Sequence, residues 1–341
     1  MSSRLDNKPQ IHTLAADLGL PPSKSPCQGI LKFVAGRVRR IARKFNCRCL
    51  NDLLEATARD VDTVFKVIYS DQDLARISAE YASKGEHIFA RLAEELSQPD
   101  DYAITIRRRC QEAWEPQFVS VIDCRGDKIF KIYFSKWHEL AHLLTLTPQM
   151  RLVFRRSHSH ATAHDPEEKL MDIIASEAGF LPDFLSTGSP IEISFDAIRQ
   201  IKKEFCPDAS LQSAIIGIVK ALPSPCILVE ARLANRKRES VNESQLELGL
   251  GQRVAMPALR AVHATVNMAA REDGVQFHRN WRVPGNSVIA RVFEEGGYAE
   301  ADEDLSWWST SSGSRLAPFP VRVKAKKAGD SVQALLIPLA A

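Results

Sequence analysis

The pattern HELAH brings three residue types used in metal chemistry into one short stretch, at His138, Glu139 and His142. Residues four apart lie on one face of a helix with β-carbons about 5–6 Å apart, so the two imidazoles can hold one ion. Glu139 points to the side, where its carboxylate can reach a water beside that ion. The pattern therefore predicts a zinc site that carries its own general base.

A catalytic zinc site uses three protein ligands and one open position, so a third ligand must come from another segment. The next predicted helix offers two candidates, Glu167 and Glu168. Asp172 lies four residues after Glu168 on the same face, whereas Met171 occupies the matching place after Glu167. We expect Glu168 to bind Zn²⁺ and Asp172 to accept a hydrogen bond from a ligand histidine, which fixes the histidine tautomer.

Peptide hydrolysis also needs a group that stabilises the developing oxyanion. His158, His160 and His164 lie in the polar loop between the two predicted metal helices, and Tyr133 precedes the HELAH pattern. A histidine is preferred, but the sequence does not select among them. Solvated loop histidines are an equally good interpretation for each of the three taken singly.

The elements around this pattern follow from residue type. Strands are expected at residues 118–123 and 128–134, which are rich in β-branched and aromatic residues, with Gly126 in a tight hairpin turn between them. Ser135 is the expected N-cap of the first metal helix, which runs to about Leu146. The second metal helix is expected at residues 167–179, capped by Asp165 with Pro166 in its first turn.

Apolar residues recur at helical spacing in several other segments. The expected helices cover residues 29–45, 50–59, 73–96, 194–205 and 211–221, and a strand is expected at residues 226–232.

The run from WHELAHLL to EKLMDIIASEAGFLP resembles the ImmA/IrrE-type metallopeptidases over about residues 60–235. The sequences Met171-Asp172 and Phe180-Leu181-Pro182 stand at the places that this family's pattern uses. The resemblance implies a thermolysin-like zincin core with Glu as third ligand. It also implies peptidase activity on regulatory proteins, or a role in stress or mobile-element control. Gly179 departs from the pattern, because leucine is common there.

Composition sets broad limits on the function. The chain has 341 residues, 45% apolar and 26% charged, with a net charge of +3, which is typical of a globular protein and excludes disorder along its whole length. It has no apolar run of 18 residues and no apolar core of a secretion signal near its start, so we expect a cytoplasmic protein without membrane contact. Seven scattered cysteines are expected to be reduced.

The sequence predicts an α+β protein in three parts. Residues 1–27 are expected to form a loose arm with one short helix, residues 28–235 a metallopeptidase domain with a helical N-terminal part, and residues 253–341 a small mostly-β domain. The polar stretch at residues 234–252 is the expected boundary.

Two functions from different classes fit these patterns. The favoured one is a zinc endopeptidase that cleaves a regulatory protein, often a helix-turn-helix DNA-binding repressor encoded nearby. The alternative is a transcriptional regulator or partner-binding protein with a structural or sensory zinc site. In that case the basic helix face would bind DNA or a partner, although a solvated face is the preferred interpretation of these residues. Glu139 favours the peptidase, because a structural site needs no general base. The basic face comprises Arg37, Arg39, Arg40, Arg43 and Lys44.

Overall fold

The computed structural model describes residues 5–97, 102–146, 165–185, 192–235, 257–310 and 314–339. The chain has the mixed α+β composition that its sequence predicts. It divides into two compact units, one made of residues 1–184 and 200–217 and the other of residues 185–199 and 218–341. Each unit is described below by itself.

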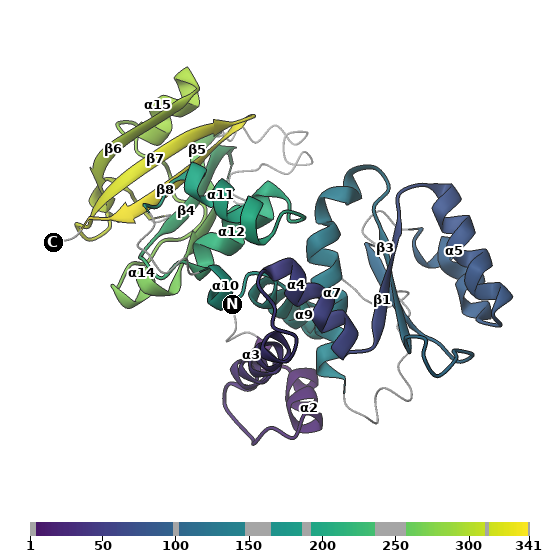
Figure 1. The fold of residues 1–341 in the computed structure, drawn as a ribbon. Helices are drawn as coiled ribbons and strands as arrows, with labels where there is room; N and C mark the ends of the chain where they lie inside the picture. The colour runs from purple at the N-terminus through teal and green to yellow at the C-terminus, as the bar shows by residue number, and fades with distance from the viewer. Residues whose placement is uncertain are drawn as a thin grey trace, which may run out of the picture. The chain divides into compact units, whose positions relative to one another are not determined.

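The first unit combines a small sheet with helices (Figure 1). Its elements are α2 (Pro9–Asp17), α3 (Pro26–Lys44), α4 (Leu50–Asp60), β1 (Thr63–Ile68), α5 (Asp71–Ser83), η1 (His87–Arg91), α6 (Leu92–Glu95), β2 (Ala103–Arg107), β3 (Phe118–Asp123), η2 (Gly126–Lys131), α7 (Ile132–Thr145), α9 (Pro166–Ala178) and α10 (Pro182–Leu185). Helices α11 (Phe195–Phe205) and α12 (Leu211–Ala221) follow.

The sheet of the first unit has the strand order β1-β3-β2, with β1 parallel and β2 antiparallel to β3. Side chains alternate between its two faces, as the pleat of a strand requires. Val119 and Val121 of β3 join the apolar cluster that also contains residues of α5 and η1. Ser120 and Ile122 therefore point to the opposite face, on which α7 packs. The sheet thus lies between α5 and α7 (Figure 1).

The expected strand at residues 128–134 is wrong, and so is the hairpin. Gly126 does turn the chain, with φ at 58°, but the chain then forms η2 and enters α7 at Ile132. The physical reason is that β1 and β2 already occupy both edges of β3, which leaves no edge for a third partner. Ser135 is consequently buried inside α7 and is not its N-cap.

Two expectations for the N-terminal half also need correction. The expected single helix at residues 73–96 is broken after α5, where Gly85 adopts a positive φ of 85° that other residues rarely take. The segment at residues 1–27, expected to be a loose arm, contains helix α2, in which Ile11 and Leu14 are buried. Asp6 accepts a hydrogen bond from the Cys27 backbone at 3.0 Å, so this segment is packed.

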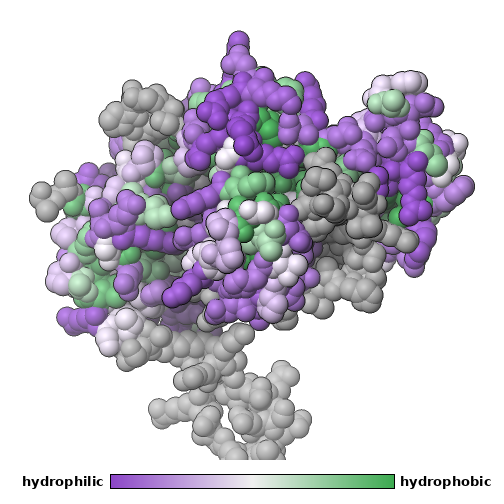
Figure 2. All heavy atoms as spheres, turned by 90° about the horizontal axis from the view of Figure 1, so that it is seen from below, coloured by the Kyte–Doolittle hydropathy of each residue, from purple (hydrophilic) through white to green (hydrophobic). Residues whose placement is uncertain are grey.

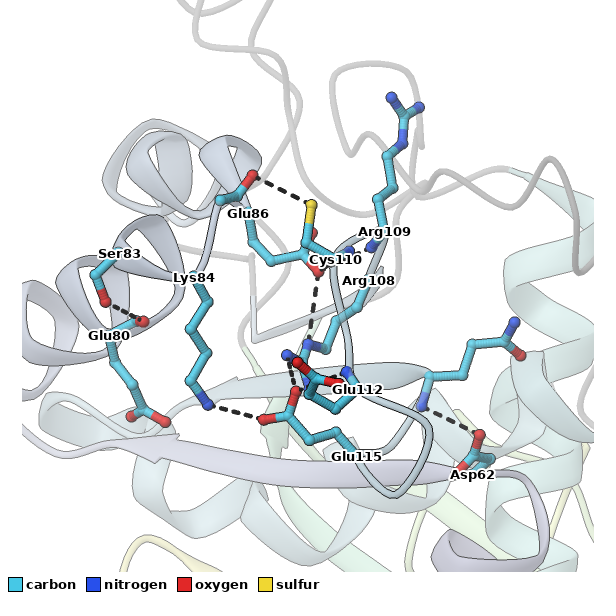
Figure 3. Close-up of polar contacts among 12 residues, drawn as sticks. Asp62, Glu80, Ser83, Lys84, Glu86, Arg108, Arg109, Cys110, Glu112 and Glu115 are labelled. Atoms are coloured by element: carbon cyan, nitrogen blue, oxygen red, sulfur yellow. Dashed lines mark hydrogen bonds and ion pairs between the residues drawn. The ribbon is translucent and has the colours of Figure 1, made fainter.

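An ionic cluster fixes the chain where it leaves β2 (Figure 3). Arg108, which is buried, lies 2.6 Å from Glu115 and 3.6 Å from the buried Glu86. Glu86 also accepts the backbone N–H groups of Arg109 and Cys110, both at 2.8 Å. Glu86 thereby holds the Arg108 side chain and the backbone of the next two residues together. The cluster therefore anchors the end of β2, three residues after Thr105.

The second unit is built on a five-stranded antiparallel sheet with the order β5-β4-β8-β7-β6. Its further elements are β4 (Ile227–Ala234), β5 (Ala258–Val266), α14 (Met268–Glu272), α15 (Val288–Glu295), β6 (Tyr298–Asp304), η4 (Leu305–Trp307), β7 (Pro320–Ala328) and β8 (Ser331–Pro338). One sheet face forms a core with α15 and the rings of Phe277, Trp281 and Trp308.

The expected domain boundary at residues 234–252 differs from the observed division. Strand β4 pairs with both β5 and β8, so it belongs to the C-terminal sheet and not to the preceding domain. The apolar strand CILVEAR was assigned to the wrong side because strand pairing across a long connection leaves no local signal. The polar stretch itself lies mostly outside the described residues.

Hydrophilic side chains surround smaller hydrophobic areas on the face that Figure 2 shows. Among the described helices, none combines the length and the apolar character that a membrane span requires.

Candidate metal centre

Helix α7 supplies three of the expected site residues. Its apolar side is fully buried, with Trp137, Leu140 and Leu144 at most 1% exposed, and this burial holds the helix against the sheet and α9. His138 and His142 lie one turn apart on the side that faces α9.

Helix α9 begins as the sequence predicts. Asp165 is the N-cap, and its side chain accepts the Glu167 backbone N–H at 2.8 Å, with Pro166 in the first turn. This start places Glu168 in the first turn of α9. The N-terminal end of a helix favours a negative side chain, which suits a carboxylate there.

The far end of α9 is fixed against the start of α7. Tyr133 donates a hydrogen bond from its hydroxyl to the Gly179 carbonyl oxygen at 2.6 Å. A Cβ atom on Gly179 would lie 2.9 Å from Trp137 Cδ1 and 2.9 Å from the Ala175 carbonyl oxygen. The close approach of the two helices therefore requires glycine here.

Ligand atoms of three residues converge between the helices. The Nε2 atoms of His138 and His142 are 3.3 Å apart, His138 Nε2 lies 3.2 Å from Glu168 Oε2, and His142 Nε2 lies 3.5 Å from Glu168 Oε1. Zinc bonds of about 2.0–2.1 Å at tetrahedral angles place neighbouring ligand atoms about 3.3 Å apart. The two Glu168 distances involve different carboxylate oxygens, and one ligand atom from each residue lies within 4.8 Å of the others, so the donor set suits a zinc ion. No ligand atom of Glu167 belongs to this group.

Asp172 lies behind His138. Its Oδ1 is 3.0 Å from His138 Nδ1. A carboxylate accepts hydrogen bonds, so Asp172 can hold the imidazole proton on Nδ1, which would leave the Nε2 lone pair for a metal ion beside Glu168 and His142. The second residue of the expected E-x-x-x-D pair therefore stands where an orienting group for a metal ligand is needed.

The Glu139 side chain contacts the sheet. Its carboxylate is fully buried and accepts a hydrogen bond from the Thr105 hydroxyl at 2.6 Å. Thr105 in turn lies 2.7 Å from the Ser120 hydroxyl on the neighbouring strand. The sheet face that packs on α7 thus carries polar groups beneath Glu139.

The remaining candidates are the residues expected to stabilise an oxyanion. The hydroxyl of Tyr133 is engaged by Gly179 in a buried site where desolvation raises its pKa, so it is not placed to stabilise an oxyanion. His158, His160 and His164 lie outside the described residues.

The basic face of α3 makes contacts within its own unit. Arg37 donates to the Leu144 carbonyl oxygen at the end of α7, at 3.0 Å, and lies 3.6 Å from Asp60. Lys44 also pairs with Asp60 at 2.9 Å, and Arg39 pairs with Asp183 at 3.1 Å. Much of the positive charge of this helix is therefore compensated by the chain itself.

Sequence reasoning missed strands β1 and β2 and with them Thr63 and Thr105, and it gave no role to Ser120. The sequence does contain a signal for these strand hydroxyls. The segments TVFKVI, AITIR and FVSVID each carry one hydroxyl residue among β-branched or aromatic residues. A hydroxyl inside a buried strand needs a hydrogen-bond partner, so its presence points to a polar group facing the sheet.

Comparisons with known proteins show little. Neither the known protein families nor the curated proteins contain a match to this chain. The chain is similar to a solved structure described as a Mycobacterium tuberculosis transcriptional regulator, at 11% identity, over 90% of this chain and 88% of that one, with a TM-score of 0.41. A similarity this low supports no conclusion about function.

Proposed function

We propose that this chain is a zinc-dependent endopeptidase with a thermolysin-like core, related to the ImmA/IrrE-type metallopeptidases. The proposal rests on one observation: His138, His142 and Glu168 each bring a ligand atom within 4.8 Å of the others, while Glu139 follows His138 directly on α7. A structural zinc site would need the three ligands and a fourth, and it would have no use for a buried carboxylate at its side.

The roles of the residues follow from their positions. A zinc ion bound by the three ligands would polarise a scissile carbonyl and acidify a water molecule. Glu139 would take a proton from the attacking water and then give it to the leaving amine. Asp172 would hold the His138 ring so that Nε2 keeps its lone pair toward the site. The proposed substrate is a regulatory protein, with a helix-turn-helix repressor encoded nearby as the first candidate.

Glu139→Gln tests this function, because it keeps shape and hydrogen bonding but removes the base. The purified variant should hold about one zinc per chain, as the wild type should, since Glu139 is not one of the three converging ligands. Cleavage of the neighbouring regulator, or of a peptide library read by mass spectrometry of new termini, should fall by about 10²–10⁴-fold.

Glu167→Gln is the matched control, because Glu167 is a glutamate near the site whose ligand atoms do not join the group. This variant should cleave as the wild type does. A Glu139→Gln protein with full activity in the cell would contradict the peptidase proposal even with zinc bound. Loss of function on charge reversal at Arg40 and Arg43 would then favour the regulator instead.

A further inference from the structure

A line of buried hydroxyl groups ends on the Glu139 carboxylate. Thr105 Oγ1 lies 2.6 Å from Glu139 Oε2, the Thr105 and Ser120 hydroxyls are 2.7 Å apart, and Thr63 lies 3.1 Å from Ser120. The three hydroxyl residues come from β2, β3 and β1, so the line crosses the whole sheet. Glu139, Thr105 and Ser120 are 0% exposed and Thr63 is 6% exposed.

The strand register brings the two central hydroxyls together. Thr105 pairs with Ser120 across β2 and β3. Three positions away, the Asp123 backbone N–H donates to the Tyr102 carbonyl oxygen, so that pair is hydrogen-bonded. The two kinds of antiparallel pair alternate along the strands, so Thr105 and Ser120 form the other kind, in which side chains approach more closely.

The number of available protons determines which hydroxyl donates in each of these hydrogen bonds. A threonine or serine hydroxyl has one proton to donate. An ionised Glu139 carboxylate can only accept, so Thr105 must use its proton on Glu139. Ser120 must then donate to Thr105, and Thr63 to Ser120. Every hydroxyl in the line points its proton toward the carboxylate.

Packing alone does not explain these hydroxyls. The opposite face of the same strands is filled with Ile104, Ile106, Val119 and Val121, all at most 4% exposed. A valine has the shape of a threonine, and an unpartnered buried hydroxyl costs free energy. Three linked hydroxyls on one sheet face are therefore expected where a buried polar group, here Glu139, requires a donor.

We propose that Thr105 is a positioning residue that holds the Glu139 carboxylate in the orientation needed for proton transfer, with Ser120 and Thr63 orienting the Thr105 hydroxyl. This inference rests on the proposed peptidase function. Helix α7 fixes the Glu139 backbone, but its side chain retains rotatable bonds that a short charge-assisted hydrogen bond can lock. A base misplaced by about 1 Å can lose on the order of 10²-fold in rate.

The experiment compares Thr105→Val, which removes only the hydroxyl, with Thr105→Ser, which keeps it. Both full-length proteins are assayed for zinc content and for kcat and KM on the substrate that the wild type cleaves. Thr105→Val should keep one zinc per chain and its KM, and lose about 10–100-fold in kcat. Thr105→Ser should recover most of that loss.

Thr57→Val is the matched control, because Thr57 is equally buried and its hydroxyl bonds to the Leu53 carbonyl oxygen within α4 at 2.7 Å. It should lose stability without a selective loss of kcat. A second measurement needs no activity: denaturant unfolding of Thr105→Val, of Glu139→Leu, which lacks the acceptor oxygen, and of the double variant. The coupling between the two sites should change the unfolding equilibrium constant by about tenfold or more.

The outcomes separate the two proposals. A wild type that cleaves nothing overturns the peptidase function and with it the role of Thr105. An active wild type with unchanged kcat in Thr105→Val overturns the positioning role alone, as does a loss that Thr105→Ser fails to recover. Additive unfolding effects in the double variant would also overturn it, because the contact would then carry no energy.

Discussion

Asp172 Oδ1 lies 3.0 Å from His138 Nδ1, one helical turn from the Glu168 oxygens that face His138 Nε2. Two carboxylates on one face of α9 thus contact the two ring nitrogens of His138. Asp172 is 55% exposed at its side chain, so the fold does not need it for packing. We propose that its role is to fix the His138 imidazole.

Asp172→Ala should therefore weaken zinc binding by about 10–100-fold with little change in stability. The loss follows because the His138 ring would rotate and its proton would no longer be held on Nδ1. Competition with a chelating indicator measures the dissociation constant. Asp172→Asn retains an oxygen acceptor and should lose less, so an equal loss in both variants would point to charge and not to orientation.

A second prediction separates the two neighbouring glutamates. Glu168→Ala should release zinc during gel filtration, because a catalytic site has three protein ligands and the variant would keep only two. Glu167→Ala should retain it, since its carboxylate does not reach the group formed by His138, His142 and Glu168. Metal analysis of both purified variants decides the point. The reverse pattern would show that the assigned third ligand is the wrong residue.

The convergence of His138, His142 and Glu168 could be predicted from sequence because most of their relations are local. The i, i+4 spacings of His138 and His142, and of Glu168 and Asp172, fix which side chains share a helix face before any tertiary structure is known. Asp165 and Pro166 likewise predict the start of α9, because an N-cap aspartate and a proline in the first turn are local features of a helix N-terminus.

The environment of Glu139 could not be predicted in the same way. Thr105 lies 34 residues before Glu139 and contacts it only because β2 joins the sheet next to β3. Short strands such as β2 and β1 carry weak local signals, and their neighbours are set by tertiary packing. The wrong strand at residues 128–134 has the same origin, because its composition suits a strand but no free edge of β3 remains.

Gly179→Ala should destabilise the protein, because the added Cβ would overlap Trp137 and the Ala175 carbonyl oxygen at the junction of α7 and α9. Overpacking of this kind costs about 1–3 kcal/mol. Gly36→Ala is the control, since that glycine lies within α3 with nothing within 4 Å of the added atom. It should stabilise the helix by up to about 1 kcal/mol. Thermal unfolding of both variants checks the opposite signs.

Acid should weaken the ionic cluster at the end of β2. Hydrogen bonds from Arg108, Lys84 and the Glu112 backbone lower the pKa of Glu115 from 4.5 to about 2. A lowered folded-state pKa stabilises the protein above the unfolded value, and that stabilisation is lost as the pH falls from about 4.5 toward about 2. Urea unfolding of the wild type and Glu115→Gln should therefore differ most near neutral pH, and the two should converge near pH 2. A difference that stays constant with pH would mean that the carboxylate charge contributes nothing.

The last prediction concerns where the chain can be cut. A fragment ending at residue 235 keeps β4 but removes β5 and β8, the two strands to which β4 is hydrogen-bonded. Ile227, Val229 and Ala231 are 0% exposed in the intact sheet and would become accessible on both sides of the strand. An unpaired apolar strand is a template for association, so this fragment should aggregate and bind a hydrophobic dye. A fragment ending at residue 222 removes β4 as well and should be markedly more soluble under the same conditions. Light scattering of the two purified fragments compares them directly. Equal solubility of both would mean that β4 finds a partner within the N-terminal unit, and the boundary expected near residue 235 would then be the better one.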